Sequence, residues 1–247
     1  MKQQLFNILK QVDSSNNYAM GKVHEGLAKN GMAWFAYEQT SGKGQRGKIW
    51  KSLAGENIIL SVAVEPSGVF EISKFYFNAL VSLTVRNFIQ ELVEEKVYIK
   101  WPNDIYICDK KAGGILIENI VNSISWKWSV VGIGLNINQN EFENDLENAI
   151  SIFQINHKKA NVINIAQKLH VKIVEEIKSF SAENETDILE EYNSFLYKKG
   201  VKTALKDSSG IFSATIISVN AEGNLIVKRE NYIAYRFGEI EWLKDTV

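Results

Sequence analysis

Residues 97–118 read VYIKWPNDIYICDKKAGGILIE, in which short β-rich runs alternate with polar segments. Strands are predicted at residues 97–101, 105–108 and 114–118. Pro102 fixes a turn that presents Asn103 and Asp104 at the end of the first strand. A turn at 109–110 would then make Lys111 the start of the return strand of a hairpin. Taken alone, the pattern is equally typical of a hairpin whose lysines only keep its tip soluble.

Further elements are predicted on both sides of this hairpin. Additional strands are predicted at 33–37, 58–64 and 128–136, and helices near 20–31, 72–92, 162–177 and 188–195. After Gly200 the chain changes character, with short strands predicted at 202–205, 212–219, 225–228 and 232–237. The sequence therefore predicts an α+β protein, with a sheet and helices in residues 1–198 and a small all-β domain in residues 199–247.

Composition excludes several classes of protein. The 247 residues include 28 Lys+Arg, 29 Asp+Glu and 45% apolar residues, which argues against a disordered chain or a surface that coats nucleic acid. The single cysteine, Cys108, excludes an internal disulfide and is expected to be a small packed residue, and the three histidines lack metal-ligand spacing. The N-terminus lacks the apolar stretch of a signal peptide, and no apolar run approaches the about 20 residues that span a bilayer. We expect a cytoplasmic protein without a membrane partner.

The segment GKGQRGK at residues 42–48 joins three glycines to cations without any acid. Glycines let backbone N–H groups approach a phosphate, and each close charge pair is worth about 4 kcal/mol at an effective dielectric of about 20. The segment formally matches dinucleotide and Walker loops, but Ile49 stands where Ser or Thr would bind magnesium, and the residues that follow lead to a strand. An anion site of another kind is predicted, with a solvated basic loop as the alternative.

The segment DSSNN at residues 13–17 precedes the first predicted helix. Its short polar side chains can cap that helix. The same side chains could equally hydrogen-bond a small polar ring, so the segment is informative only in combination with the other two.

Together the three segments resemble the catalytic domain of biotin protein ligases. The family's glycine–arginine loop is similar to residues 39–48, its K-W-P-N-D stretch to residues 100–104, and its K-x-x-G-I-L strand to residues 111–116. The resemblance covers most of residues 10–140. It implies a mixed sheet flanked by helices, akin to class II aminoacyl-tRNA synthetases, in a catalytic domain that binds biotin and ATP, followed by a small C-terminal β-barrel.

The resemblance also implies roles for individual residues. It implies that biotin contacts Ser14, Ser15, Asn16, Gln39, Gly42, Lys43, Lys111, Gly114 and Leu116. It implies that ATP contacts Gly44, Gln45, Arg46, Gly47, Trp50, Asn103 and Asn136. It implies catalytic roles for Lys43, Arg46, Asp104 and Lys111, with Mg²⁺ arriving with ATP near Asp104 rather than at a side-chain cluster.

The implied reaction has two steps. Biotin and ATP would give biotinyl-5′-AMP and pyrophosphate, and a lysine of a biotin carboxyl carrier domain would then take the biotinyl group and release AMP. Fixed cations and backbone donors suit this reaction, because joining a carboxylate to an α-phosphate forces two anions together. Bifunctional members also bind DNA through an N-terminal helix-turn-helix domain. Only about a dozen residues precede Asp13, so we expect a monofunctional ligase that does not bind DNA, whether monomer or homodimer.

The chain departs from the family pattern in its glycine–cation loop. Lys43 and Gln45 stand where the family usually has arginine. Because glutamine carries no charge, it cannot replace the bidentate clamp of arginine, which puts retention of the intermediate in doubt. Our hypothesis is that the adjacent Arg46 compensates.

Two other functions compete with this interpretation. A lipoate or octanoate ligase or transferase shares the fold and also modifies a carrier lysine, but lacks the glycine–cation loop at this position. A non-catalytic nucleotide- or RNA-binding module could use Trp50, Trp101 and the basic loop for stacking and charge. That second alternative leaves Lys111 without a role.

Overall fold

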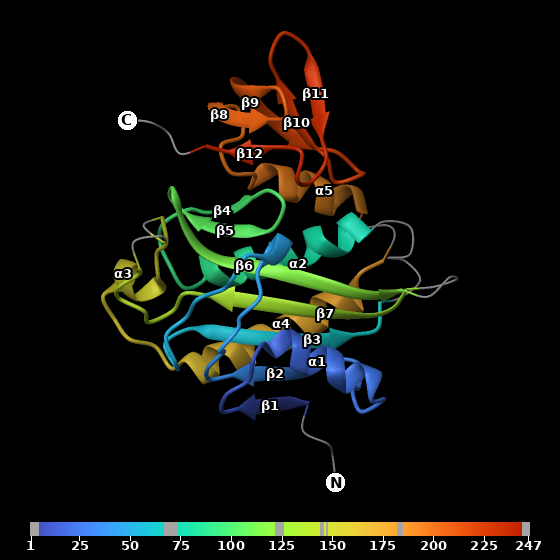
Figure 1. The fold of residues 1–247 in the computed structure, drawn as a ribbon, viewed down its shortest axis with the longest axis vertical. Coiled ribbons are helices and arrows are strands. Elements are labelled where there is room, and N and C mark those ends of the chain that lie inside the picture. Colours follow the sequence, from blue (N-terminus) through green and yellow to red (C-terminus); the bar gives the residue numbers. More distant parts are fainter. Residues whose placement is uncertain are drawn as a thin grey trace.

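The larger sheet of the protein has seven strands. The computed structural model describes residues 5–66, 74–121, 126–143, 146, 148–181 and 185–243. The strand order is β1-β2-β3-β7-β6-β5-β4 (Figure 1). The strands are β1 (Phe6–Leu9), β2 (Met32–Ala36), β3 (Ile58–Val64), β4 (Val97–Lys100), β5 (Asp104–Ile107), β6 (Lys110–Val121) and β7 (Trp126–Leu135). Only the β1–β2 pair is parallel, so the sheet is mixed, as expected.

Helices cover both faces of this sheet (Figure 1). They are α1 (Ser15–His24), α2 (Lys74–Gln90), α3 (Ile152–Asn156), α4 (Val162–Ser179) and α5 (Glu185–Ser194). β3 is buried on both faces. Its Leu60 and Val62 join the main core, which includes residues of α2 and α4, while Ala63 packs with Ala19 of α1. The alternation of strand side chains therefore leaves Ser61 of β3 on the α1 face, where the polar end of α1 lies.

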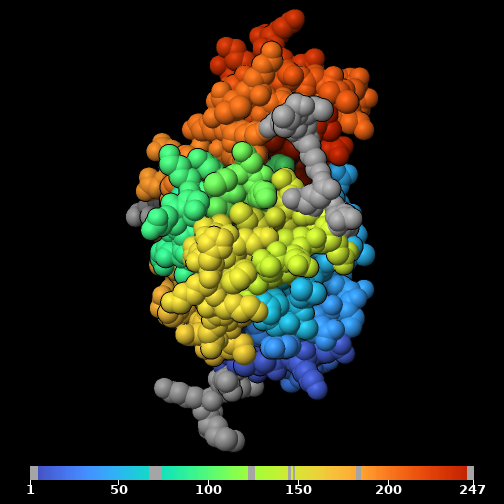
Figure 2. Space-filling model, turned by 90° about the vertical axis from the view of Figure 1, so that its left-hand side faces the viewer, coloured from blue at the N-terminus to red at the C-terminus, as the bar shows by residue number. Residues whose placement is uncertain are grey.

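The C-terminal residues form a second, five-stranded antiparallel sheet at one end of the molecule (Figures 1 and 2). Its strands are β8 (Lys202–Asp207), β9 (Gly210–Val219), β10 (Leu225–Lys228), β11 (Tyr232–Tyr235) and β12 (Glu241–Trp242). The order is β11-β10-β9-β8-β12. The expected barrel was wrong in this respect: within the described residues β11 and β12 do not pair, and the sheet is open. A two-residue β12 bonded to β8 is too short to close it.

Several other expectations need correction. The first helix ends at His24 rather than near Gly31, because Gly26 takes a left-handed conformation (φ 70°), and Leu27 is exposed. Cys108 is not packed: it is exposed in the turn between β5 and β6, with φ 52°. The short elements β1, α3 and β12 were not expected. The expected start of the second helix, near residue 72, lies outside the described residues. None of the described helices is long and apolar enough to cross a membrane.

Candidate active site

A cavity of about 1320 Å³ opens between the large sheet and the C-terminal sheet. This exceeds the size of a typical single-ligand pocket, about 300–1,000 Å³. Its lining includes most of the residues expected from the sequence: Ser14, Ser15, Asn16, Gln39, Lys43, Gly44, Gln45, Arg46, Trp50, Asn103, Asp104, Lys111, Gly114, Leu116 and Asn136. Gly42 and Gly47 belong to the same loop but do not line the cavity. Segments far apart in the sequence therefore share one site.

The polar residues before and at the start of α1 form one buried end of the cavity. Ser14 caps the helix by accepting a hydrogen bond from the backbone N–H of Asn17 (3.5 Å), so the expected cap is confirmed. Ser15 and Asn16 are 5% and 3% exposed. The backbone N–H of Ser15 donates to Oε1 of Gln39 (2.7 Å), which ties Gln39 to the helix. We call Ser15, Asn16 and Gln39 the ring end of the cavity, after the small polar ring that such side chains could hydrogen-bond.

Further bonds hold Asn16 in place. Its Nδ2 donates to the carbonyl oxygen of Leu116 (3.2 Å) and to Oε2 of Glu118 (2.9 Å). Its Oδ1 accepts from the hydroxyl of Ser61 (2.6 Å), which also lies 2.8 Å from the Ser15 hydroxyl. Every polar atom of the Asn16 side chain is thus bonded, which fixes its orientation before any ligand binds. Neither Ser61 nor Glu118 was expected from the sequence.

Two glycines of β7 allow this close packing. A Cβ atom on Gly132 would overlap the side chain of Asn16, and one on Gly134 would overlap the ring of Trp50. Glycine inside a strand often marks such a close approach. The spacing V-G-I-G-L at residues 131–135 was the available signal, and the sequence interpretation missed it.

The glycine–cation loop, residues 42–48, lies at the cavity rim. The backbone N–H of Trp50 donates to the Gly42 carbonyl (2.8 Å), and that of Gly44 to the Lys48 carbonyl (2.7 Å), so the segment closes on itself with a short 3-10 turn, η1 (Gln45–Gly47). The next element after this turn is β3 rather than an α-helix, which agrees with the exclusion of Walker and dinucleotide loops from the sequence. Most of the loop is exposed. Its backbone and cations are therefore accessible to an anion.

Two cations of this loop have weak partners that are only partly buried. Nζ of Lys43 lies 3.5 Å from Oε1 of Glu118. Arg46, with φ 53°, donates from Nη1 to the carbonyl oxygen of Gly238 (3.2 Å) and lies 6.0 Å from the Phe237 ring centroid. Arg46 therefore reaches the segment after β11, in the C-terminal sheet region.

Lys111 and Asp104 form an ion pair in the cavity wall. Nζ of Lys111 lies 2.7 Å from Oδ1 of Asp104, and the two side chains are 34% and 32% exposed. Lys111 lies on β6, the return strand of the hairpin, as expected. A Cβ on Gly114 would come within 3.2 Å of the Asp104 carboxylate, so the absence of a side chain there leaves room beside the pair.

Asn103 and Asn136 line the cavity, but their side-chain amides also hold its walls together. Nδ2 of Asn103 donates to the carbonyl oxygen of Ile115 on β6. Nδ2 of Asn136 donates to the carbonyl oxygen of Ile150 (3.1 Å) and approaches that of Lys111 (3.4 Å). Both side chains therefore help to position β6, which carries Lys111 of the ion pair.

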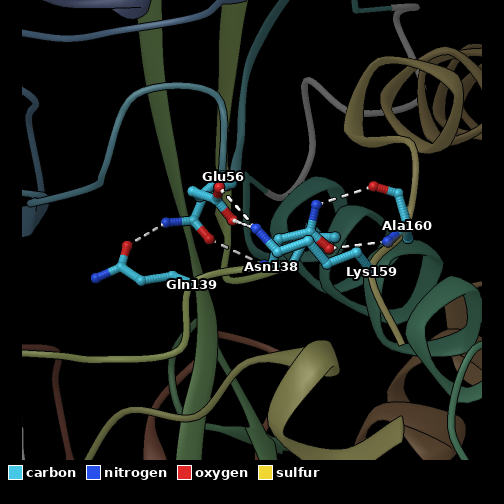
Figure 3. Close-up of polar contacts among 7 residues, drawn as sticks. Glu56, Asn138, Gln139, Lys159 and Ala160 are labelled. Carbon is cyan, nitrogen blue, oxygen red and sulfur yellow. Dashed lines mark hydrogen bonds and ion pairs between the residues drawn. The ribbon is translucent and has the colours of Figure 1, made fainter. Parts of the chain in front are cut away.

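A network behind the wall fixes the segment that follows β7 (Figure 3). Asn138 and Ala160 exchange two hydrogen bonds, Nδ2 to the Ala160 carbonyl (2.9 Å) and the Ala160 N–H to Oδ1 (2.9 Å). Nζ of Lys159 lies 3.2 Å from Oε1 of Glu56, and the backbone N–H of Asn138 donates to the Glu56 carbonyl (2.8 Å). These bonds join the segment before β3 and the segment after β7 to the segment before α4, which keeps Asn136 in the cavity wall.

Lys100 is a cavity residue to which the sequence analysis gave no role of its own. Its Nζ donates to the Tyr106 hydroxyl (3.1 Å) and lies 5.3 Å from the Trp242 ring centroid. Burial lowers the pKa of Lys100 from 10.5 to about 8; Asp104 partly offsets this effect and Lys111 adds to it. Lys100 thus places a second cation close enough to Lys111 and Asp104 to interact with both.

The C-terminal sheet region completes the cavity. The indole N–H of Trp101 donates to the Gly223 carbonyl (2.9 Å), and its ring meets that of Phe237 edge-on at 6.0 Å. The lining from this region includes Lys206, Asp207, Tyr235, Phe237, Gly238 and Trp242. No residue there could be assigned from the sequence, because the packing between the two sheets decides which of them face the cavity.

The chemistry of the cavity suits an anion beside a small polar group. Cationic lining residues include Lys43, Arg46, Lys48, Lys100 and Lys111. Among the residues described, the buried indole N–H of Trp50 has no acceptor and is available as a donor. The described residues contain no group of three or more His, Cys, Asp or Glu that could hold a metal ion. The arrangement can hold two ligands side by side, one of them strongly negative.

Comparisons with known proteins agree with this chemistry. A family model described as the biotin/lipoate A/B protein ligase family matches residues 8–138. The bifunctional ligase/repressor BirA of Escherichia coli strain K12 is 31% identical over 143 residues, 57% of this chain and 43% of that protein. The Bacillus subtilis protein of the same name is 25% identical over 224 residues, 90% of this chain and 69% of the relative. The aligned part thus spans less than half of the Escherichia coli relative.

A solved structure matches the whole chain. The biotin protein ligase from Aquifex aeolicus, in complex with biotin and ATP, superposes with a TM-score of 0.80 at 25% identity and 98% coverage of both chains. The match extends over both sheets, so the C-terminal sheet is part of the shared architecture.

Proposed function

Because the chain belongs to the biotin/lipoate A/B protein ligase family, we propose that it attaches biotin to a lysine of a biotin carboxyl carrier domain, using ATP. The observation that supports this most is the shared cavity. It unites a buried polar end, an exposed glycine–cation loop and the Lys111–Asp104 pair. The solved Aquifex aeolicus relative, whose ligands are biotin and ATP, supports the choice of substrates.

Biotin would lie with its ureido ring at the ring end. Ser15, Asn16 and Gln39 offer donors and acceptors of fixed orientation there, and Leu116 offers an apolar wall. Gly42 supports this end by its backbone, since a Cβ on it would overlap the Gln39 amide. The biotin carboxylate would then point toward Lys43, Lys111 and Gly114. Because these buried polar groups are already hydrogen-bonded, they lose little conformational entropy when a ligand binds.

ATP would occupy the side of the cavity formed by the loop and the C-terminal sheet. Gly44, Gln45, Arg46 and Gly47 would supply backbone and side-chain donors to the phosphates, and Trp50 a ring and an N–H. Mg²⁺ would enter with the nucleotide. Asp104 suits this ion, because Mg²⁺ sites often use one or two carboxylates together with substrate phosphates. When bound, the ion would neutralise phosphate charge.

In the first step a biotin carboxylate oxygen attacks the α-phosphorus, an O–P bond forms and the bond to pyrophosphate breaks. Lys111, oriented by Asp104 at 2.7 Å, would meet the negative charge that develops at the α-phosphate. In the second step the neutral amine of the carrier lysine attacks the biotinyl carbonyl carbon and a C–N bond forms. The C–O bond to the phosphate breaks, AMP leaves with that electron pair, and the amine nitrogen loses one proton to solvent. The same cations would stabilise the departing phosphate.

The partner and the compartment follow from the reaction. The carrier lysine must reach the reaction centre, so its domain would dock over the cavity mouth. Consumption of ATP favours the cytoplasm. A homodimer stays a prediction, as does the division of the chain at residue 198.

The test is a transfer assay with the purified protein. Incubation with biotin, ATP, Mg²⁺ and a biotin carboxyl carrier domain should increase the carrier's mass by one biotinyl group, and omission of ATP should abolish the increase. A parallel reaction with lipoate and its carrier tests the nearest alternative. Transfer of lipoate in place of biotin, or no transfer of either, would refute the proposal.

A further inference from the structure

Glu118 connects the ring end with the glycine–cation loop. It follows Gly114 and Leu116 on the same face of β6, because strand side chains alternate with period two. Its Oε2 accepts the 2.9 Å bond from Asn16, and its Oε1 lies 3.5 Å from Nζ of Lys43. One carboxylate therefore contacts a residue expected to bind the biotin ring and also Lys43, toward which the biotin carboxylate, and hence the phosphate that becomes joined to it, is proposed to point.

The two contacts of Glu118 differ in strength. Asn16 is 3% exposed and bonded on every polar atom, so it holds one carboxylate oxygen firmly. The Lys43 side chain is 43% exposed, and its ion pair is long. Ion pairs of this kind are weak and exchangeable. A phosphate that binds the loop can therefore draw Lys43 away while Glu118 stays in place.

We propose that Glu118 competes with the phosphate of biotinyl-5′-AMP for Lys43 and thereby limits how long the protein retains this intermediate. The proposal rests on the proposed function. Glu118 acts through Lys43 and is a positioning residue. Each time Lys43 pairs with Glu118, the phosphate of the intermediate loses the contact with the Lys43 ammonium group. Gln45, two residues further along the loop, is uncharged and cannot replace that cation.

The variant Glu118→Gln separates this role from simple support of Asn16. The amide oxygen of glutamine can still accept the bond from Asn16, whereas the charge that attracts Lys43 is gone. A matched control is Glu143→Gln. Glu143 pairs with Lys51, another lysine that lines the cavity, at 2.6 Å, so this change also removes a carboxylate paired with a cavity lysine.

The experiment measures the dissociation rate of synthetic, radiolabelled biotinyl-5′-AMP from the full-length protein. Glu118→Gln should slow release about two- to fivefold, the range that an exposed ion pair provides. Glu143→Gln should leave the rate unchanged. In a Lys43→Ala background, the added Glu118→Gln change should have no effect, because the competition needs Lys43.

Other outcomes overturn the proposal. The proposal is wrong if Glu118→Gln releases biotinyl-5′-AMP at an unchanged or faster rate. It is also wrong if Glu143→Gln slows release equally, or if Glu118→Gln slows release just as much in the Lys43→Ala background. The proposed function fails separately, if the unaltered protein makes no biotinyl-5′-AMP from biotin and ATP. Because the dissociation assay starts from the synthetic intermediate, the two failures are distinguishable.

Discussion

The ring end and the glycine–cation loop line the same cavity but are built in opposite ways. At the ring end, Ser15 and Asn16 are buried and hydrogen-bonded, and glycines of β7 allow the tight fit. In the loop, Lys43 and Arg46 are exposed and have weak partners. A fixed end favours recognition of one rigid ring. An exposed loop with replaceable partners favours an anion that must arrive, react and leave.

The largest effect is expected at Lys111, where the ligands of the two regions are proposed to meet. Lys111→Ala should lower the rate of biotinyl-5′-AMP formation by about 10²-fold or more, the range for loss of one group that stabilises transition-state charge. Biotin affinity should fall much less, because the ring end is unchanged. Single-turnover formation of the adenylate, with biotin binding measured separately, checks this result.

Stability provides the control for Lys111→Ala. The free energy of unfolding should change by less than about 1 kcal/mol, because the Lys111–Asp104 pair is a third exposed. Adenylate formation at the rate of the unaltered protein would show that the biotin carboxylate and the α-phosphate do not meet at this residue.

The second effect concerns the rigidity of the ring end. Gly132→Ala should raise the Kd for biotin about 10- to 100-fold, because the added methyl overlaps Asn16 and overpacking costs about 1–3 kcal/mol. Gly21→Ala is a matched control: a Cβ at Gly21 of α1 meets nothing within 4 Å, so biotin binding should be unchanged. Titration with labelled biotin distinguishes the two variants, and equal affinities would contradict a closely fitted ring end.

The third effect is a pH dependence from Lys100. The pKa of Lys100 is about 8 in the folded protein, against 10.5 ordinarily, so the unfolded chain binds more protons between these values and stability rises with pH across that window. From about pH 7 to about pH 9.5, the protein should gain about 2 kcal/mol relative to Lys100→Met. Urea unfolding at both pH values measures the difference. If the free energy of unfolding changed equally in both proteins between the two pH values, Lys100 would be well solvated in the folded protein.

The smallest effect is expected in the exposed loop. Arg46→Ala should speed release of biotinyl-5′-AMP about two- to fivefold, because Arg46 offers a charge beside Gln45 and its present partner, the Gly238 carbonyl, is exposed. Arg46→Lys keeps the positive charge but lacks the planar guanidinium group that donates two hydrogen bonds, so its release rate should be intermediate. If Arg46→Ala released biotinyl-5′-AMP at the rate of the unaltered protein, Arg46 would have no role in retaining the intermediate.

Local patterns predicted much of this fold. The strands at 58–64 and 225–228 were predicted with their observed bounds, because apolar runs between turn residues are local signals. Three short motifs likewise located most of the expected site residues, which line the cavity. Short elements such as β1 and α3 lack enough residues to show a period.

Contacts between distant segments could not be predicted in the same way. The bond from Asn16 to Glu118 joins residues 102 positions apart and depends on how α1 packs on the sheet, where its main contacts are with β3 and β7. The same holds for Phe237, which meets Trp101 only because the two sheets pack together. Cys108 was misassigned since a one-residue shift of the turn moved it out of the strand.

The most direct test of the account is biotin-dependent exchange of labelled pyrophosphate into ATP, without any carrier. If the two regions bring a biotin carboxylate to the α-phosphate, exchange should require biotin, fail with lipoate, and fall about 10²-fold in Lys111→Ala. Exchange that is absent with biotin, or equally fast without it, would contradict the account.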